Sequence, residues 1–350
     1  SEQFITLPPW SLRHKTDGTI QKDLDDGIDT IGKKMTVCQL YAKQIRHRGN
    51  VRYNTKNGRK RLMKLLEEDK LGGCPIDSVK LSDAKEWAIR MKEKGISYKT
   101  ISNDKRSLKA AFYTAIQDDC IRKNPFDFQL NTVIEDDTEP KVPLTPAQEE
   151  SFLSFAQNDK VYQKYYDELI ILLGTGLRIS ELCGLTDTDI DFENRIINVD
   201  HQLLRSAETG YYIETPKTKS GIRQIPMSEK VYEAFNRVLK RSRGAKAVTI
   251  DGYSNFLFLN RDGYPKTATN YDGMFRGLAK KYNKYHEEAL PKVMTPHTLR
   301  HTFCTNMANA GMNPKALQYI MGHSNITMTL NYYAHATFDS AKAEMLRIAA

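Results

Sequence analysis

The part of this chain that most constrains its fold is the stretch from residue 295 to residue 336, TPHTLRHTFCTNMANAGMNPKALQYIMGHSNITMTLNYYAHA. Thr295 is a favourable N-cap, Pro296 suits the first helical position, and no helix-breaking residue follows before Gly311. This pattern predicts a helix over residues 296 to about 309.

The first turn of that helix carries His297 and Arg300. Because they are three positions apart, they share one helix face. Unpaired backbone N–H groups and the helix dipole favour an anion at this end of a helix. The pair is therefore a candidate anion-binding site.

A second, short helix is predicted in PKALQYIMGH. Its inward-facing residues are expected to be Ala316, Leu317 and Ile320. Gly322 would close the helix and place His323 directly after its end. A third segment, residues 326–335, contains Tyr332 and Tyr333.

Each of these features also has an ordinary structural explanation. A His-x-x-Arg pair commonly lies on a solvated helix face, a Gly-His pair commonly caps a helix, and a tyrosine pair commonly belongs to a core. Together, however, they bring a histidine, an arginine, a second histidine and a candidate nucleophile to three adjacent elements. That combination is typical of a site that handles phosphate.

At 350 residues the chain is long enough for about two domains. Its five cysteines are Cys38, Cys74, Cys120, Cys183 and Cys304. They are scattered and form no Cys-x-x-Cys pair, which favours a reducing cytosol and argues against a structural zinc site. No charged-then-apolar leader opens the sequence, and the longest apolar run, LIILLGTGL, is too short to span a bilayer. We therefore expect a cytoplasmic protein without membrane contact.

The positive charge of the chain is concentrated in one region. The whole chain has a formal net charge of +9, whereas residues 33–123 contain 23 Lys and Arg against 10 Asp and Glu. A solvated basic surface is the simpler explanation. A compact unit with this excess is more typical of a nucleic-acid partner.

Residues 33–130 are predicted to form an all-helical bundle, after a segment, residues 1–32, that we expect to be ordered only in part. Apolar residues recur at helical spacing in TVCQLYAKQI, LSDAKEWAIRMKEKG and SYKTISNDKRSLKAAFYTAIQDD, whereas RHRGNVR and KNGRKR are predicted to be basic loops or helix starts. The third helix is expected to turn a basic outer face toward a phosphate backbone. Its basic residues are Lys99, Lys105, Arg106 and Lys109.

Residues 131–144 are acidic and punctuated by proline, which is typical of an interdomain linker. Thr145 and Gln148 form a capping-box pattern at the start of a second domain, residues 145–336. A buried helix through ELIILLG is expected to end at the glycines of GTGLRISELCGL. Arg178 follows that turn, where it can serve as a phosphate ligand or as a structural ion-pair partner.

The segments RIINVDHQLL, GYYIETP and IRQIPM are predicted to form a small antiparallel sheet, to which FLFLNRDGYP can add an edge. Between the last two of the three strands, the turn KTKSG carries Lys217 and Lys219, which in an ordinary turn would only be solvated. The predicted fold class is α+β and mainly helical: an all-α bundle followed by a mixed helical domain with a small antiparallel sheet.

The ordered set GLRISEL, KTKSGIRQIP, HTLRHTF and IMGH, followed by a tyrosine two residues before a histidine, resembles the tyrosine recombinases, a family of DNA integrases. The chain looks closest to integrases of conjugative transposons. The resemblance covers Thr145 to His335, and the preceding bundle looks like the core-site DNA-binding domain of that family.

The resemblance implies a role for each matching residue. The implied catalytic residues are Arg178, Lys217, His297, Arg300, His323 and Tyr333, with Glu181 as pocket support. Here Arg178 and Arg300 would bind phosphate, and Tyr333 would be the nucleophile. Lys219 competes with Lys217, which is preferred because it opens the Lys-Thr pair. Tyr332 competes with Tyr333, which is preferred because it keeps the Tyr-x-His pattern.

The chemistry that the resemblance implies suits these residue types. Attack by a tyrosine oxygen on a phosphodiester builds charge on the non-bridging oxygens, which bidentate guanidinium groups match. A lysine can protonate the leaving 5′-oxygen, and the covalent phosphotyrosine conserves the bond energy for rejoining. No carboxylate cluster for magnesium is visible in the sequence, so we expect neither a metal nor a cofactor.

The resemblance thus implies a site-specific recombinase that integrates and excises a mobile element, acting on double-stranded DNA at element ends and target sites. A homo-oligomer, a tetramer on two DNA sites, is expected. The alternatives are a nicking and closing topoisomerase and a catalytically silent DNA-binding regulator. In residues 337–350, an apolar stripe is predicted on a helix. It would pack on its own domain or, as the family implies, in a neighbouring subunit.

Overall fold

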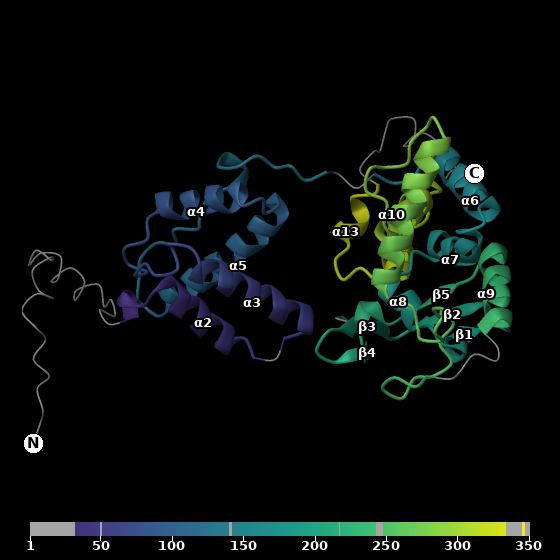
Figure 1. Ribbon diagram of the computed structural model, residues 1–350, viewed down its shortest axis with the longest axis horizontal. Coiled ribbons are helices and arrows are strands. Elements are labelled where there is room, and N and C mark those ends of the chain that lie inside the picture. Colours follow the sequence, from purple (N-terminus) through teal and green to yellow (C-terminus); the bar gives the residue numbers. More distant parts are fainter. Residues whose placement is uncertain are drawn as a thin grey trace, which may run out of the picture. The chain divides into compact units, whose positions relative to one another are not determined.

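The computed structural model describes residues 32–49, 51–139, 142–216, 218–242, 248–333 and 345–346 (Figure 1). The chain divides into two compact units, an N-terminal unit, Ser1–Glu139, and a C-terminal unit, Pro140–Ala350. The division falls inside the segment predicted to be a linker. Among the described residues, no helix combines the length and the apolar character that crossing a membrane requires.

The N-terminal unit is helical throughout its described part. Its helices are α2 (Val37–His47), α3 (Tyr53–Glu67), α4 (Leu81–Glu93) and α5 (Tyr98–Gln117), with short 3-10 turns η2 (Gly32–Lys34) and η3 (Leu130–Thr132). Trp87 of α4 and Phe112 of α5 are fully buried and both contact Phe126, at ring-centroid distances of 5.8 and 5.4 Å. The predicted helical bundle is therefore confirmed.

One segment of this unit differs from the prediction. KNGRKR lies inside α3 instead of forming a loop or a helix start. Gly58 costs such a helix about 1 kcal/mol relative to alanine. Leu62 and Leu66 are completely buried on the inner side of α3, and the stability of their packing outweighs that local cost.

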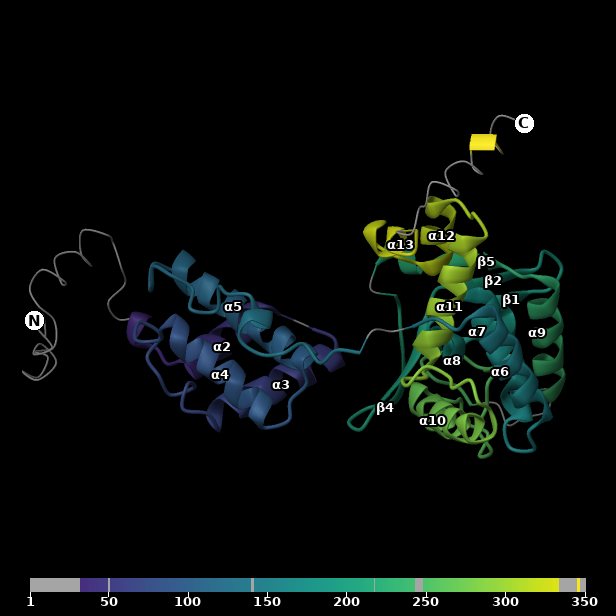
Figure 2. The same ribbon diagram turned by 90° about the horizontal axis from the view of Figure 1, so that it is seen from above.

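The C-terminal unit is built around α7, Tyr166–Thr175, which packs against α9 and α11 (Figure 2). The other helices are α6 (Pro146–Asn158), α8 (Ile179–Gly184), α9 (Glu229–Ser242), α10 (Ala268–Tyr285), α11 (Pro296–Asn309), α12 (Pro314–Met321) and α13 (Thr327–Leu330). Short 3-10 turns are η4 (Gln163–Tyr165), η5 (Asp187–Asp189) and η6 (Lys219–Gly221). Leu169, Ile171 and Leu172 are fully buried, because the apolar helix α7 is enclosed by its neighbours.

The helix predicted over residues 296–309 is α11, and it has these bounds. The second predicted helix is α12, on which Leu317 is buried and Ile320 partly buried, as predicted. Ala316 is exposed, contrary to the prediction, and Met321 is buried as well. Eight residues make about two turns, so only a narrow stripe of α12 can face the core. In the third segment, the described helix is the short α13.

The strands form two small antiparallel sheets. β1 (Ile190–Asp191), β2 (Ile196–Val199) and β5 (Arg223–Pro226) lie in the order β1-β2-β5, and β3 (Gln202–Ser206) pairs with β4 (Gly210–Glu214). The prediction of one sheet is therefore wrong in detail, since the strands on either side of KTKSG belong to different sheets.

The break between β2 and β3 falls at His201. Its ring is buried and both ring nitrogens are engaged, with Asp200 at 2.6 Å and the Gly184 carbonyl at 2.7 Å. These bonds hold the chain against the end of α8 and redirect it after β2. Asp189, Asp200 and His201 place ligand atoms within 4.8 Å of one another, but the hydrogen bonds already account for this cluster.

Candidate active site

Three arginines from different elements meet at the C-terminal end of α12: Arg178 before α8, Arg223 on β5, and Arg300 on α11. Their donor–acceptor pairs are Arg223 Nε to the Ile320 carbonyl (2.6 Å), Arg300 Nη2 to the Met321 carbonyl, and Arg178 Nη2 to the Gly322 carbonyl (3.0 Å). The last carbonyls of a helix lack partners within it and carry the negative end of its dipole. The end of α12 is thus a fixed acceptor for three cations.

Glu181 supplies the carboxylate of this cluster. It is only 3% exposed, and its oxygens accept hydrogen bonds from Arg178 Nη1 at 2.6 Å and from Arg223 Nη2 at 2.8 Å. Burial alone would raise the pKa of this carboxyl, but hydrogen bonding and charge from Arg223, with the charges of Arg178 and Arg300, hold the pKa at about 2. Glu181 is therefore ionised at neutral pH.

Arg300 is 5% exposed, and its Nη1 also donates to the Gly176 carbonyl at 2.5 Å. Burial and then the charge of Arg178 lower the pKa of Arg300 to about 9, against the opposing effect of Glu181. Three guanidinium groups against one carboxylate leave a surplus of positive charge, so the cluster would gain stability from a bound anion.

One pocket brings together three of the predicted residues, since Arg178, His297 and Arg300 all line it. His297 is exposed at the start of α11, where helix geometry also favours an anion. The sequence-based expectation that His297 and Arg300 share a face is met.

His323 follows Gly322, whose φ of +61° ends α12 in the left-handed conformation. The imidazole is buried, and its Nδ1 lies 3.0 Å from the Thr329 hydroxyl. Burial first, and then the charges of Arg300, Arg178 and Arg223, lower the pKa of His323 to about 4. With its pKa lowered this far, the ring carries no charge at neutral pH.

The two tyrosines differ in their surroundings. The Tyr333 hydroxyl donates a hydrogen bond to the Met312 carbonyl at 2.5 Å. Tyr332 packs against His301, with ring centroids 4.8 Å apart. Burial raises the pKa of both hydroxyls, but only for Tyr332 does the charge of Arg300 oppose that rise. Of the two tyrosine hydroxyls, that of Tyr332 is therefore the one whose pKa the charge of Arg300 affects.

Lys217 lies outside the described residues. Its neighbours Pro216 and Thr218 line a pocket together with Arg178 and Glu181. Lys219 is exposed in η6.

Arg223 was missed by the sequence analysis. Arg223 and Ile225 both face inward from β5, with Gln224 between them facing outward. A charged residue at an inward strand position indicates a buried partner of opposite charge. That signal was present in IRQIPM.

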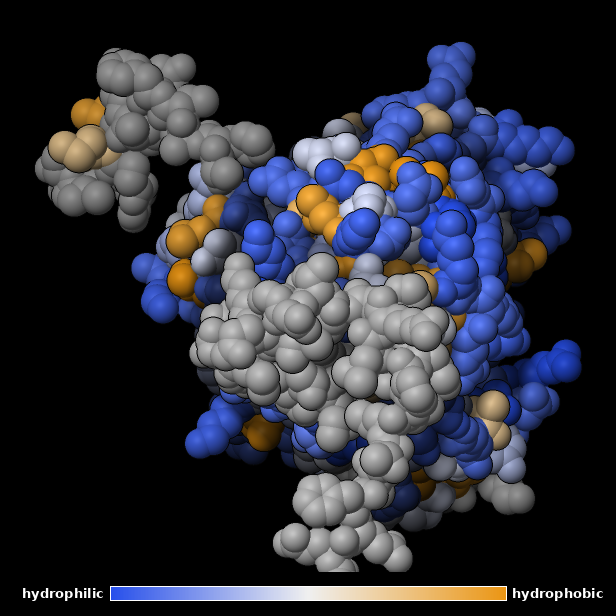
Figure 3. All heavy atoms as spheres, turned by 90° about the vertical axis from the view of Figure 1, so that its left-hand side faces the viewer, coloured by the Kyte–Doolittle hydropathy of each residue, from blue (hydrophilic) through white to orange (hydrophobic). Residues whose placement is uncertain are grey.

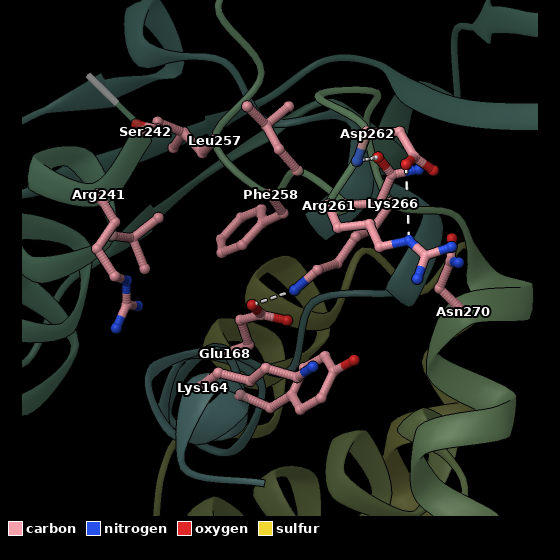
Figure 4. A pocket seen from close by; sticks show the side chains of 14 residues that line it. Lys164, Glu168, Arg241, Ser242, Leu257, Phe258, Arg261, Asp262, Lys266 and Asn270 are labelled. Atoms are coloured by element: carbon pink, nitrogen blue, oxygen red, sulfur yellow. Dashed lines mark hydrogen bonds and ion pairs between the residues drawn. The ribbon is translucent and has the colours of Figure 1, made fainter. Parts of the chain in front are cut away.

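A separate pocket, lined by residues from η4 to α10, shows different chemistry (Figure 4). Lys266 pairs with Glu168 at 2.5 Å, and the Tyr271 hydroxyl donates to the same carboxylate at 2.6 Å. Its buried charges are therefore satisfied internally. Among the described residues, none of the predicted catalytic side chains lines this pocket.

The predicted basic face of α5 is only partly present. Lys99 and Arg106 are exposed, but Lys105 is buried, with its ammonium 4.4 Å from the centre of the Phe128 ring. Lys109 pairs with Asp127 at 2.5 Å. The chain after α5 folds back over these two lysines, so placing Lys105 on the outer face was wrong.

A second basic stripe lies on α3, where Lys56, Lys60 and Lys64 are exposed at spacings of four. On the side of the molecule shown in Figure 3, the coloured surface is largely hydrophilic and is interrupted by small apolar patches.

Comparisons with known proteins identify the family of this chain. Residues 143–340 match the model of the phage integrase family. The transposase from transposon Tn916 of Enterococcus faecalis is 68% identical over 338 residues, which cover 97% of this chain and 83% of that protein.

Two solved structures of the Tn1549 transposon integrase are each 78% identical to this chain. One, an arginine-to-lysine variant in complex with a circular intermediate DNA, has a TM-score of 0.86 and covers 90% of this chain and 99% of that one. The other, a tyrosine-to-phenylalanine variant in complex with transposon right end DNA, has a TM-score of 0.85 and covers 90% and 100%.

Proposed function

Because the chain belongs to the phage integrase family of tyrosine recombinases, we propose that it integrates and excises a mobile DNA element by site-specific strand exchange. The observation that carries this proposal is the cluster of three arginines around Glu181, which has a surplus of positive charge. The charge of this cluster acts on both His323 and Tyr332. We propose that the reaction takes place in the cytoplasm, because its substrate is DNA.

In the proposed reaction, Arg178 and Arg300 bind the non-bridging oxygens of the scissile phosphate, with His297 and neutral His323 as further donors. The tyrosine oxygen attacks phosphorus and forms a 3′-phosphotyrosine while the bond to the 5′-oxygen breaks. Charge develops where the guanidinium groups are already fixed, so little reorganisation is needed. A 5′-hydroxyl of the partner strand then attacks the phosphotyrosine, which joins the two strands and releases the tyrosine.

We propose Tyr332 as the nucleophile, in preference to Tyr333. The Tyr333 hydroxyl is engaged by the Met312 carbonyl, whereas Tyr332 lies within the electrostatic reach of Arg300. The arginine and the tyrosine replaced in the two Tn1549 integrase structures are 154 positions apart, which is the separation between Arg178 and Tyr332. The Tyr-x-His pattern still favours Tyr333, so the choice stays a prediction.

Lys217 is the proposed general acid. A substrate with sulfur at the bridging 5′ position has a leaving group that needs no proton. We expect Lys217→Ala to slow cleavage of ordinary DNA by about 100-fold or more and to cleave the sulfur substrate at nearly the normal rate. Single-turnover adduct formation measures both rates. Selective rescue of Lys219→Ala instead would transfer the role to Lys219.

Cleavage is expected to proceed in excess EDTA. The arginines and histidines of the pocket supply the positive charge and hydrogen bonds that a metal ion would otherwise bring to the phosphate. The measurement is adduct formation on nicked DNA with and without chelator. A strict requirement for a divalent ion in the chemical step would contradict the proposed mechanism.

The N-terminal unit is proposed to bind the DNA backbone through the exposed residues of α5. Replacing both Lys99 and Arg106 by glutamine should weaken binding to specific and random DNA alike and reduce the salt slope by about 0.9 for each lost phosphate contact. Lys109 already pairs with Asp127, so Lys109→Gln should change the salt slope less. An unchanged salt slope in the double variant would show that this face of α5 does not contact phosphate, and the exposed lysines of α3 would then be the next candidates.

Strand exchange between two duplexes requires cleavage of all four strands, and each chain supplies one nucleophile. We therefore propose a tetramer on two DNA sites. The predicted apolar tail after Tyr333 is a candidate subunit contact, although it lies almost entirely outside the described residues.

Products with exchanged partners separate this function from a topoisomerase, which changes only the linking number. Failure to form any adduct would leave a silent DNA-binding regulator.

A further inference from the structure

Arg223 has no role in the reaction described above, yet its surroundings are as specific as those of the phosphate-binding arginines. Its side chain is 0% exposed, and each nitrogen of its guanidinium has an acceptor. The bonds are Nε to the Ile320 carbonyl (2.6 Å), Nη1 to Glu181 Oε1 (3.1 Å) and the Gly221 carbonyl (3.0 Å), and Nη2 to Glu181 Oε2 (2.8 Å).

We propose that Arg223 is a positioning residue that holds the segment carrying the general acid against the phosphate pocket. Its guanidinium joins three pieces of chain. The Gly221 carbonyl belongs to η6, the turn that follows Lys217. The Ile320 carbonyl lies near the end of α12, just before the turn to His323. Glu181 is the carboxylate that also binds Arg178. One side chain therefore joins the turn that follows Lys217 to the end of α12 and to Glu181.

Close backbone contacts support this role. A Cβ on Gly322 would lie 3.0 Å from the Ser220 carbonyl oxygen and 3.2 Å from Arg223 Nη1. The turn at Gly322 and the turn at Ser220 are therefore in direct contact. A Cβ on Gly221 would lie 2.3 Å from Pro216 Cβ. Pro216 and Gly221 therefore lie in close contact, and Arg223 donates hydrogen bonds to both the Gly221 carbonyl and the Ile320 carbonyl of α12.

Arg223 acts through other groups and does not contact the phosphate itself. Four of its five N–H donors are bonded within the protein, and its side chain has no exposed surface from which to reach DNA. The inference rests on the proposed function in two respects: Lys217 protonates the leaving oxygen, and Arg178 binds the phosphate.

The test compares Arg223→Gln on ordinary nicked DNA and on DNA with sulfur at the bridging 5′ position. If Arg223 mainly places the general acid, the variant should lose about 100-fold in cleavage rate on ordinary DNA, as expected for loss of general-acid catalysis. It should lose less than about tenfold on the sulfur substrate. Equal losses on the two substrates would overturn the proposal.

Two further variants keep this test decisive. Arg223→Lys retains the charge but cannot make the bidentate bond to Glu181, and it should show the same selective loss even if Arg223→Gln folds poorly. Arg195→Gln is the matched control, because Arg195 forms an exposed pair with Glu229 beside the same sheet and should cleave both substrates normally.

Lys217→Ala, measured in parallel, separates the two levels of the proposal. If the sulfur substrate rescues Lys217→Ala but neither Arg223 variant, the proposed function stands and the positioning role is wrong. If Lys217→Ala is not rescued, the general-acid assignment fails, and the inference about Arg223 fails with it.

Discussion

Tyr332→Phe is expected to bind element-end DNA with normal affinity and to form no covalent adduct, because the variant lacks only the oxygen that attacks phosphorus. Tyr333→Phe is the matched control. It loses the hydrogen bond to the Met312 carbonyl, which costs about 1 kcal/mol in a typical case, and it should still form the adduct. A gel-shift assay measures binding, and denaturing electrophoresis of nicked DNA complexes measures the adduct. The opposite pattern in the two variants would return the role to Tyr333.

Glu181→Ala is expected to lower the free energy of unfolding of the C-terminal unit by about 3 to 5 kcal/mol at pH 7, because it leaves buried Arg223 without its ionic partner. The measurement is urea unfolding. Glu229→Ala removes only the exposed pair with Arg195 and should cost less than about 1 kcal/mol. Equal effects in the two variants would contradict the structural role of Glu181.

The same comparison has a defined pH dependence. The folded-state pKa of Glu181, about 2, lies below its ordinary value of 4.5, so its stabilising contribution is complete above about pH 4.5 and is lost as pH falls toward 2. The difference between the native protein and Glu181→Ala should shrink over that window. His323, with its pKa lowered to about 4 from 6.5, reduces the stability of both proteins as pH falls from 6.5 to 4.

Local signals were sufficient for the elements that the sequence predicted well. The bounds of α11 follow from Thr295 and Pro296 at its start and from the break at Gly311 just after its end. The N-cap of α6 follows in the same way from the capping box of Thr145 and Gln148. Such features depend on neighbours a few residues away, so a linear pattern contains them.

Contacts between distant residues explain what the sequence did not predict. Lys105 is buried because Phe128, from the segment after α5, folds over it. The sheet divides because His201 is bonded to the Gly184 carbonyl, 17 positions earlier in the chain.

The proposed roles of Arg223 and Tyr332 likewise depend on long-range contacts. Arg223 reaches Glu181 across 42 positions, and Tyr332 is brought toward Arg300 by the packing of α11 against α12 and the turns after it. A linear pattern therefore does not contain the contacts on which the proposed choice between the adjacent tyrosines rests.

The most direct measurement is to trap the protein on nicked element-end DNA in the presence of EDTA, digest the covalent complex, and identify the modified residue by mass spectrometry. The proposed mechanism predicts a 3′-phosphonucleotide attached to Tyr332. Attachment to Tyr333 would contradict the tyrosine assignment, and attachment to any other residue, or no attachment unless a divalent metal is supplied, would contradict the mechanism itself.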